Sequence, residues 1–511
     1  MYLKQSKKGL FLFNSVTGVA QLLLNIIIVF FSVRVFFKYL GEEQYGIFSV
    51  VTVIGSITNF ANFSLNSTLI KFISEQGRTQ ESNYDILTVC SILVLVLIPI
   101  TILIYLFRSF ILLSVLKVPV EYLAASCTLL KYLLVANVFL LVGKNLTAIL
   151  DANHKIYLTN FYLFLYSVIY WGSIITIILL GYGLEYLGIA VCFSAIFWFF
   201  MVLFSSLKIW GKIHIGQLRQ NFVRVAKKHL TYSMKIYTGS VLGFLYEPLT
   251  RILISNLIGV SYAGFYDITL KVKSNIIAVF FKLLYPISPM IAHEDDKKKL
   301  GMIVKNTSKA LFYLIIPVIV ILLVCTRQII TLWIGDNVEL ISISTTILVS
   351  LSLLTVTTVT PIYIFLRLKN HPEKEIYIQA SNAIVNMIVI LLTFSTLGYY
   401  SVVLGNTISY LLPFILCIYY QKKYLDFYPF SGAKEIAKYA GVLFFITLST
   451  ALFSLLFTGV SWFNVIVISI FACVVSFFTF YFGGVLKSDE MSFLFNDKVK
   501  GLKFISNFLK K

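Results

Sequence analysis

Residues 10–33 read LFLFNSVTGVAQLLLNIIIVFFSV, a run in which no side chain carries a charge. About 20 predominantly apolar residues suffice for a helix to cross the hydrocarbon core of a bilayer. This run is longer than 20 residues, and its few polar side chains are small hydroxyl or amide groups. It therefore predicts a transmembrane helix, and the rest of the chain can be compared with it.

Runs of similar length and composition recur from one end of the chain to the other. Together they fall near 10–36, 46–73, 86–107, 123–149, 157–180, 187–209, 233–257, 263–290, 307–330, 341–366, 376–396, 399–420, 438–458 and 462–486. The spacing predicts an all-α integral membrane protein with about 14 transmembrane helices. We expect two six-helix lobes, related by an internal repeat, followed by two additional helices.

Composition excludes several other classes of protein. Of the 511 residues, 59% are hydrophobic and only 13% are charged, and the mean hydropathy is +0.89. So few charges cannot coat the surfaces of soluble domains, which excludes a soluble enzyme, a nucleic-acid-binding protein and a disordered protein. The net charge of +20 comes from Lys and Arg that stand mostly between the apolar runs. Their placement follows the positive-inside rule and predicts that both termini are cytoplasmic.

The runs and the charged segments between them predict five parts. Residues 1–210 form an N-terminal six-helix lobe, and residues 233–421 form a C-terminal one. Between them, 211–232 is a basic amphipathic linker on the cytoplasmic surface. Residues 422–486 hold the two additional transmembrane helices, and 487–511 form a basic amphipathic tail in the cytoplasm.

A pair of glycines marks the turn after the first helix of each predicted lobe. The first turn reads LGEEQYGIF from Leu40 to Phe48, and the second reads IGVSYAGFY from Ile258 to Tyr266. In each turn the two glycines are five positions apart: Gly41 and Gly46 in the first, and Gly259 and Gly264 in the second. Glycine is needed where φ is positive or where backbones touch. The matching positions predict that the two lobes are repeats, an arrangement typical of transporters.

These turns also carry a resemblance to a known family. The segment from Lys38 to Phe48, with Tyr45 before the second glycine, resembles the R/K-x-L-G-x-x-x-Y-G signature of bacterial polysaccharide exporters. These are O-antigen and lipid-linked oligosaccharide flippases of the multidrug/oligosaccharidyl-lipid/polysaccharide superfamily. In the second half, 251–266 and the Pro286–Ser288 step are similar to family segments, although Asn256 stands where the first half has Lys38.

The resemblance implies a flippase in the bacterial cytoplasmic (inner) membrane. Its substrate would be an undecaprenyl-pyrophosphate-linked oligosaccharide, such as an O-antigen or another surface polysaccharide repeat unit. Two lobes would face each other across a cavity and alternate between inward-open and outward-open states. Implied partners are the lipid-linked substrate, membrane lipids, H⁺ or Na⁺ as a coupling ion, and polysaccharide polymerase machinery, with no nucleic acid.

Polar residues within the predicted spans indicate where a substrate would bind, since such residues usually face protein or a water-filled cavity. Cations suit a pyrophosphate, and amides suit neutral polar groups. The candidates for the cavity are Arg251, Lys271, Lys282, Arg34, Asn25, Gln21 and Asn275. Glu247 and Asp267 are candidates either for ion coupling or for structural pairing. Glu247 with Arg251, and Asp267 with Lys271, stand four positions apart on their helices, a spacing that favours ion pairs.

Nothing in the sequence indicates catalysis. The five histidines are scattered, and no P-loop motif is present, so we expect no cofactor, no metal site and no ATP binding. Two alternatives remain. A cation-coupled multidrug exporter of the same superfamily would favour an acidic cavity, which the surplus of cations disfavours. A membrane-bound polysaccharide polymerase or ligase would need a sizeable outer loop, and every predicted outer connection is short.

Overall fold

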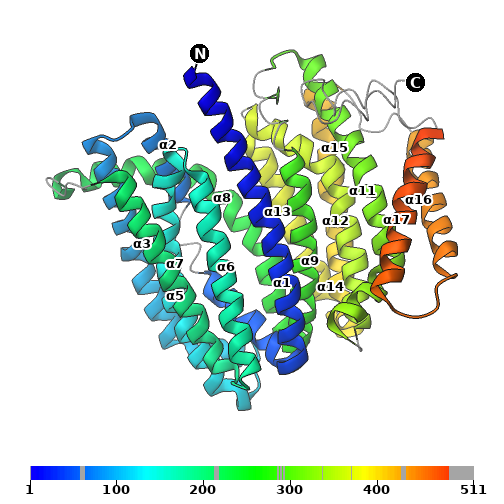
Figure 1. Cartoon of the computed structure of the whole chain (residues 1–511), viewed down its shortest axis with the longest axis horizontal. Helices are drawn as coiled ribbons and strands as arrows, with labels where there is room; N and C mark the ends of the chain where they lie inside the picture. Colours follow the sequence, from blue (N-terminus) through cyan, green and yellow to red (C-terminus); the bar gives the residue numbers. More distant parts are fainter. Residues whose placement is uncertain are drawn as a thin grey trace. The chain divides into compact units, whose positions relative to one another are not determined.

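Helices make up nearly all of the chain that the computed structural model describes (Figure 1). The described residues are 2–57, 62, 64–211, 218–284, 287, 290–291, 294–335, 338–369, 371–426 and 433–482. The predicted tail 487–511 and parts of the linker and of the Pro286–Ser288 step lie outside them. The chain divides into two compact units, Met1–Asp267 and Ile268–Lys511.

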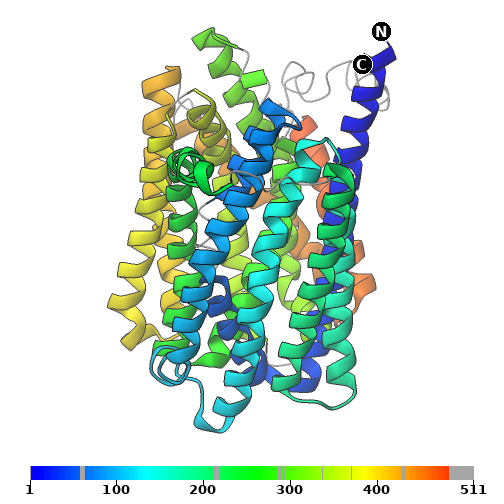
Figure 2. The same ribbon diagram turned by 90° about the vertical axis from the view of Figure 1, so that its left-hand side faces the viewer.

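The first unit is a bundle of long helices with short connections (Figure 2). In chain order the helices are α1 (Tyr2–Ile57), α2 (Leu65–Gln76), α3 (Gln80–Leu106), α4 (Arg108–Phe110), α5 (Leu123–Ala152), α6 (Ile156–Leu179), α7 (Leu184–Trp210), α8 (Leu218–Leu257) and the start of α9 (Val260–Leu284). A π-helical turn at Ile111–Val115 and a 3₁₀ turn at Val120–Tyr122 join α4 to α5. Figure 1 shows α3, α5, α6 and α7 as neighbouring helices.

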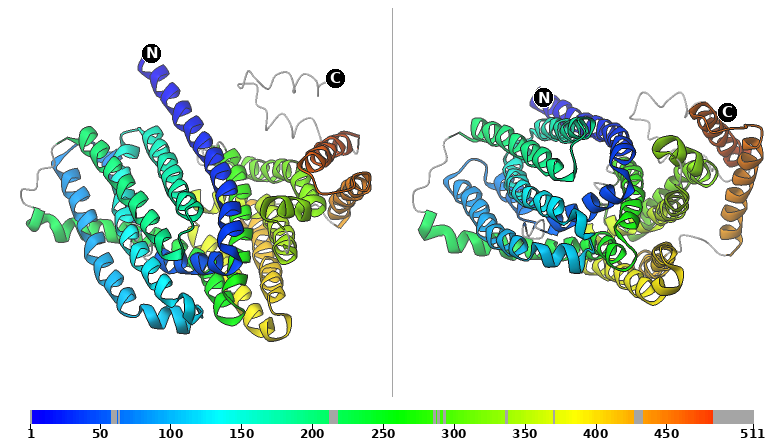
Figure 3. Two further views of the ribbon diagram at one scale, coloured as in Figure 1. Left: turned by 60° about the horizontal axis from the view of Figure 1, so that its bottom comes forward. Right: turned by 90° about the horizontal axis from the view of Figure 1, so that it is seen from below.

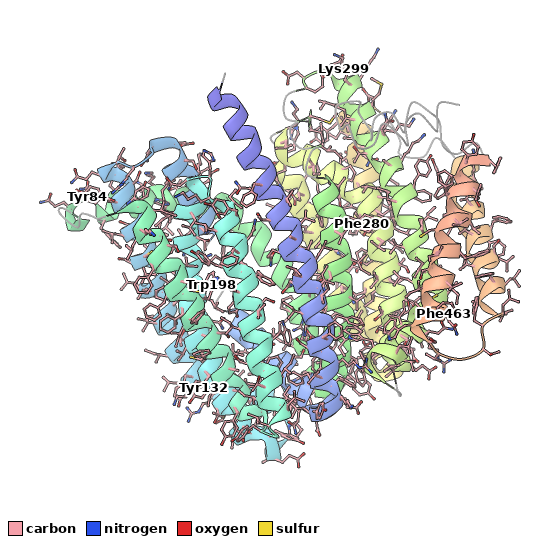
Figure 4. All side chains as sticks on the ribbon, viewed as in Figure 1. Tyr84, Tyr132, Trp198, Phe280, Lys299 and Phe463 are labelled. Carbon is pink, nitrogen blue, oxygen red and sulfur yellow. The ribbon has the colours of Figure 1, made fainter. Side chains whose placement is uncertain are left out.

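Small residues let α5 and α7 pack closely. A Cβ atom at Gly143 would lie 2.5 Å from the Trp198 ring, and one at Gly188 would lie 3.1 Å from the Leu129 Cα. Close backbone approach through small residues is how helices associate where the hydrophobic effect between them is weak. Trp198 also belongs to a buried cluster with Leu146 and Val202, and Figure 4 labels it within this bundle. These two glycines therefore hold the centre of the first unit together.

The second predicted span does not form one helix. The first helix, α1, continues through a kink at Gly41 and ends at Ile57. A separate helix, α2, then starts at Leu65, after Ser64 in a left-handed conformation (φ 57°). Asn62 lies between the two helices and accepts a hydrogen bond from Asn145 at 3.0 Å. The left-handed Ser64 and the buried contact of Asn62 thus interrupt residues 46–73, and hydrophobicity alone does not reveal this break.

The predicted linker is bound to the first unit by buried polar contacts. Within α8, His229 is fully buried, and its ring nitrogens lie 2.7 Å from the Thr68 hydroxyl and 3.1 Å from the Asp85 carboxylate. Lys228 pairs with Asp85 at 2.8 Å. Nearer the solvent, Arg224 pairs with Glu81 of α3 at 2.6 Å, and this hydrogen bond raises the pKa of the guanidinium. Protein contacts therefore hold the start of α8 on α2 and α3.

The second unit contains the remaining helices of the described chain. They are the rest of α9, then α11 (Lys297–Ile334), α12 (Glu339–Leu368), α13 (Pro372–Leu397), α14 (Tyr400–Ser409), α15 (Leu411–Leu425), α16 (Ala433–Ser454) and α17 (Trp462–Phe482). One buried core joins α9, α11, α12 and α15, and a smaller one joins α16 and α17 to α11 through Tyr313, Tyr439 and Phe480. Figure 3 shows α16 and α17 side by side, and Figure 4 labels the exposed Phe463 on α17.

Eleven helices of the described part are long and apolar enough to cross a membrane. The chain is accordingly a multi-pass membrane protein. One 40-residue segment, Val16–Gly55, covers the first predicted span and part of the second. Over the seventh and eighth predicted spans, α8 and α9 are helical but are not among these eleven. In α9 the charges Asp267, Lys271 and Lys273 lie close together along the helix. The count of fourteen spans therefore stays a prediction.

Orientation in the membrane can be tested directly. Because Lys and Arg concentrate on one set of connections, we expect those connections to be cytoplasmic. Reporter fusions that distinguish the two sides should all read as cytoplasmic after Lys155, Lys228, Lys299, Lys374, Lys434 and Lys511. An external signal from two or more of these positions would contradict the orientation.

Candidate functional site

The second glycines of the two turns, Gly46 of α1 and Gly264 of α9, lie where these two helices pack against each other. A Cβ atom at Gly46 would lie only 2.1 Å from the carbonyl oxygen of Val260. A Cβ atom at Gly264 would lie 3.0 Å from the Cα of Gly46. No side chain fits at such distances, because the neighbouring atoms belong to the backbone. The sequence thus predicted two glycine turns, and the structure brings them into contact within the first unit.

The first glycines of the two turns have a different role. Gly41 has a φ of 78° and Gly259 a φ of 138°, in the region that residues with a Cβ rarely adopt. The space where a Cβ of Gly41 would project is open, so conformation rather than crowding requires glycine there. Both turns therefore use the first glycine for its φ angle and the second for close approach. This correspondence supports the internal repeat, which stays a prediction.

A buried charge cluster lies beside this contact. The Tyr45 hydroxyl donates a hydrogen bond to Asp267 Oδ2 at 2.7 Å, and Arg251 Nη2 lies 2.9 Å from Asp267 Oδ1. Arg251 Nη1 also points to the carbonyl of Ser49 at 3.4 Å. Tyr45 is fully buried, and the side chains of Asp267 and Arg251 are 6% and 16% exposed. The cluster joins α1, α8 and α9.

The ion pair in this cluster combines residues that the sequence had assigned to different pairs. Spacing along single helices predicted that Asp267 pairs with Lys271, and that Glu247 pairs with Arg251. In the structure, Arg251 of α8 and Asp267 of α9 bind each other between helices. Whether the two intrahelical partners also contribute stays a prediction. A buried charge costs much free energy unless it is paired, so each member of the observed pair makes the other tolerable.

A cavity of about 380 Å³ opens within the first unit. The predicted residues Gln21 and Asn25 of α1 line it, together with Thr52, Asn137 of α5 and Ser167 of α6. Three aromatic side chains of α6 complete this wall, namely Tyr166, Tyr170 and Trp171. None of the lining side chains is charged. The cavity therefore offers uncharged polar groups beside aromatic rings.

Hydrogen bonds fix part of the cavity wall. The Ser167 hydroxyl donates to Asn25 Oδ1, and the Asn137 amide donates to the carbonyl of Gly55 at 2.6 Å. Thr52 donates to the carbonyl of Ser49, the residue whose carbonyl also faces Arg251. Backbone between Ser49 and Gly55 thus connects the cavity to the charge cluster.

The remaining predicted residues that the structure describes do not line the cavity of the first unit. Arg34 and Lys38 are exposed on α1, and the Lys38 ammonium lies 5.6 Å from the ring centre of Tyr39. Lys271 and Asn275 are half-buried on the part of α9 that belongs to the second unit. The side chain of Lys282 lies outside the described residues. Their roles in binding stay predictions.

Several residues of the site were not predicted from the sequence. Tyr45 was singled out only as part of the glycine turn, although it binds Asp267. Asn137 and Ser167 are single polar residues within apolar runs, a weak signal that these helices face protein. Tyr166 and Tyr170 stand four positions apart and so share a helix face, but in a chain with 31 tyrosines that pattern is common. Within the described residues, no group of His, Cys, Asp or Glu is arranged to hold a metal ion.

The architecture matches that of known membrane transporters. The structure titled "Lipid II flippase MurJ, inward closed conformation" superposes with a TM-score of 0.72, covering 92% of this chain and 100% of that one at 16% identity. The MATE multidrug transporter DinF-BH gives 0.60, covering 82% and 96% at 12% identity. An inward-facing MATE transporter of the MOP superfamily gives 0.57, covering 80% and 98% at 13% identity. At these identities the likeness establishes the fold.

The sequence identifies the family. Residues 37–343, more than half of the chain, match the model of the family described as "Polysaccharide biosynthesis protein". The chain belongs to this family, as its glycine turn predicted. No curated protein matches the sequence.

Proposed function

We propose that the protein is a flippase that moves an undecaprenyl-pyrophosphate-linked oligosaccharide from the inner to the outer leaflet of the bacterial cytoplasmic membrane. The oligosaccharide would be an O-antigen unit or a similar repeat unit of a surface polysaccharide. The observation that carries the proposal is the family match over residues 37–343, on a chain whose fold resembles that of a lipid II flippase. Membership of a polysaccharide biosynthesis family favours a glycan cargo, and the fold favours transport.

Translocation would proceed by alternating access of the two predicted lobes. A pyrophosphate is anionic, and Arg251, Lys271, Lys282 and Arg34 are the candidates for binding it. Of these, Arg251 is bound to Asp267 in the structure, and its Nε is buried without a hydrogen-bond partner among the described residues. Protonation of Asp267 would remove the negative charge that holds the guanidinium and leave Arg251 available to the substrate. That is how H⁺ would be coupled to binding.

Depletion of the protein in its host tests this function. We expect loss of the surface glycan and accumulation of complete lipid-linked repeat units that remain on the cytoplasmic side, inaccessible to an externally added glycan-labelling reagent. A polymerase defect would instead leave single lipid-linked repeat units accessible from outside, and a ligase defect would leave longer lipid-linked glycan there. If depletion leaves both the surface glycan and its lipid-linked precursor unchanged, the proposed function is wrong.

A multidrug exporter is the second candidate, because the fold also resembles those of MATE multidrug transporters. Such a protein would lower the cellular content of an organic cation such as ethidium. The wall of the cavity in the first unit has no carboxylate that would neutralise a cation. Ethidium accumulation in depleted and normal cells separates the two candidates.

A further inference from the structure

We infer that the cavity within the first unit binds a neutral sugar ring of the carried glycan, apart from the residues that bind the pyrophosphate. The inference rests on the proposed function for the nature of the cargo. It adds that the substrate is recognised in two places, by charge at the head group and by uncharged groups at the sugar.

The chemistry of the wall matches a carbohydrate. A sugar ring presents hydroxyl groups around its edge and apolar C–H groups on its faces. Amides such as Gln21 and Asn25 both donate and accept hydrogen bonds, which suits hydroxyl groups. Aromatic rings with a polar tip, such as Tyr166 and Tyr170, provide an apolar face together with a hydroxyl. A phosphate would need cations, and the wall has none.

The aromatic side of the cavity is held in place before any ligand enters. The rings of Tyr166 and Tyr170 lie 5.7 Å apart between centres, and those of Tyr170 and Trp171 lie 5.1 Å apart at 89°. Tyr166 also contacts Trp198, 6.0 Å away, within the core of the unit. A wall whose side chains are already fixed loses little conformational entropy when a ligand binds.

Polar groups on the wall are left over for a ligand. Asn25 Oδ1 accepts from Ser167, and Asn137 is committed to a backbone carbonyl. Within the described chain, no hydrogen bond involves the side chain of Gln21 or the hydroxyls of Tyr166 and Tyr170. Polar groups that the fold does not use, gathered around one cavity, are the feature that fixes a ligand's orientation in a binding site.

Size limits what can bind. Small-molecule sites span about 300–1,000 Å³, and a volume of about 380 Å³ is near the lower end. This space accommodates a short saccharide but not a polyprenyl chain with its glycan. The cavity therefore binds one part of the substrate while the lipid stays in the membrane.

Binding of the free glycan tests the inference without requiring transport. The probe is a neutral oligosaccharide released from the host's own surface polysaccharide by partial hydrolysis, added to the full-length protein in lipid nanodiscs. Saturation-transfer NMR should detect its binding. Gln21→Leu and Tyr170→Phe should each weaken it at least tenfold, while Tyr182→Phe, a tyrosine exposed between α6 and α7, should leave it unchanged. Binding of glycan-free undecaprenyl pyrophosphate should be the same in all four proteins.

The outcomes separate this inference from the proposed function. If Gln21→Leu and Tyr170→Phe bind the glycan as the unaltered protein does, or if only ethidium binds in the cavity, the inference is wrong. If depletion shows flippase activity but neither variant changes glycan binding, the proposed function stands alone. If the glycan binds in the cavity but depletion leaves the lipid-linked precursor unchanged, the cavity is a sugar site in a protein with another cargo.

Discussion

Gly46→Ala should largely prevent the protein from folding, although it adds only one methyl group. The new Cβ would lie 2.1 Å from the carbonyl oxygen of Val260, and neither atom can move without shifting a helix. Overpacking of this kind typically costs about 1–3 kcal/mol, and more where the backbone is the obstacle. We expect a sharp loss of monodisperse protein after detergent extraction and a lower midpoint of thermal unfolding, with export lost in parallel.

A matched control separates crowding from helix propensity. Gly172 lies within α6, and a Cβ added there would meet nothing within 4 Å. Gly172→Ala should therefore be neutral or stabilising, by about 0.5–1 kcal/mol at most, because alanine loses less backbone entropy than glycine. If Gly46→Ala folds as well as Gly172→Ala, the contact between the glycine turns does not hold the first unit together.

The class of fold was predictable because it depends on composition and run length, which are local properties. Bilayer thickness sets the length of each apolar run, so most helices were located from the sequence. The predicted helix boundaries were wrong where polar residues and packing interrupt an apolar run. Residues 46–73 are apolar enough to predict one span, but the chain ends one helix at Ile57 and begins another at Leu65. In α8 and α9 the helices were predicted, whereas their status as spans stays a prediction.

The site was less predictable because its contacts join distant parts of the chain. The sequence identified Asp267 and Arg251 as buried charges, and polarity within apolar runs is a sound reason for that. It could not predict that these two residues pair with each other. Nor could it predict the contact with Tyr45, which stands 222 positions before Asp267. Intrahelical spacing offered nearer partners, whereas the packing of Gly46 on Val260 brings α1 and α9 together beside this cluster. The glycine turns, which were recognised, are thus what positions the residues that were not.

Neutralising only one member of the Arg251–Asp267 pair should destabilise the protein strongly. In Asp267→Asn, the guanidinium remains buried with no opposite charge at 2.9 Å, and breaking a buried pair in this way costs about 3–5 kcal/mol. The exposed pair of Arg224 and Glu81 is the matched control. Glu81→Gln should cost no more than about 1 kcal/mol, because exposed ion pairs contribute little. Thermal unfolding of both variants in detergent measures the difference.

The double variant Asp267→Asn with Arg251→Gln then separates scaffold from function. Removing both charges eliminates the uncompensated one, so the double variant should regain most of the stability that Asp267→Asn loses, and a double-mutant cycle measures the coupling. If the pair serves only to hold α8 against α9, export should return with stability. If Asp267 exchanges a proton and Arg251 binds the pyrophosphate, no neutral pair replaces them. We therefore expect a stable protein in the membrane that does not export glycan, and recovered export would reduce the pair to a structural contact.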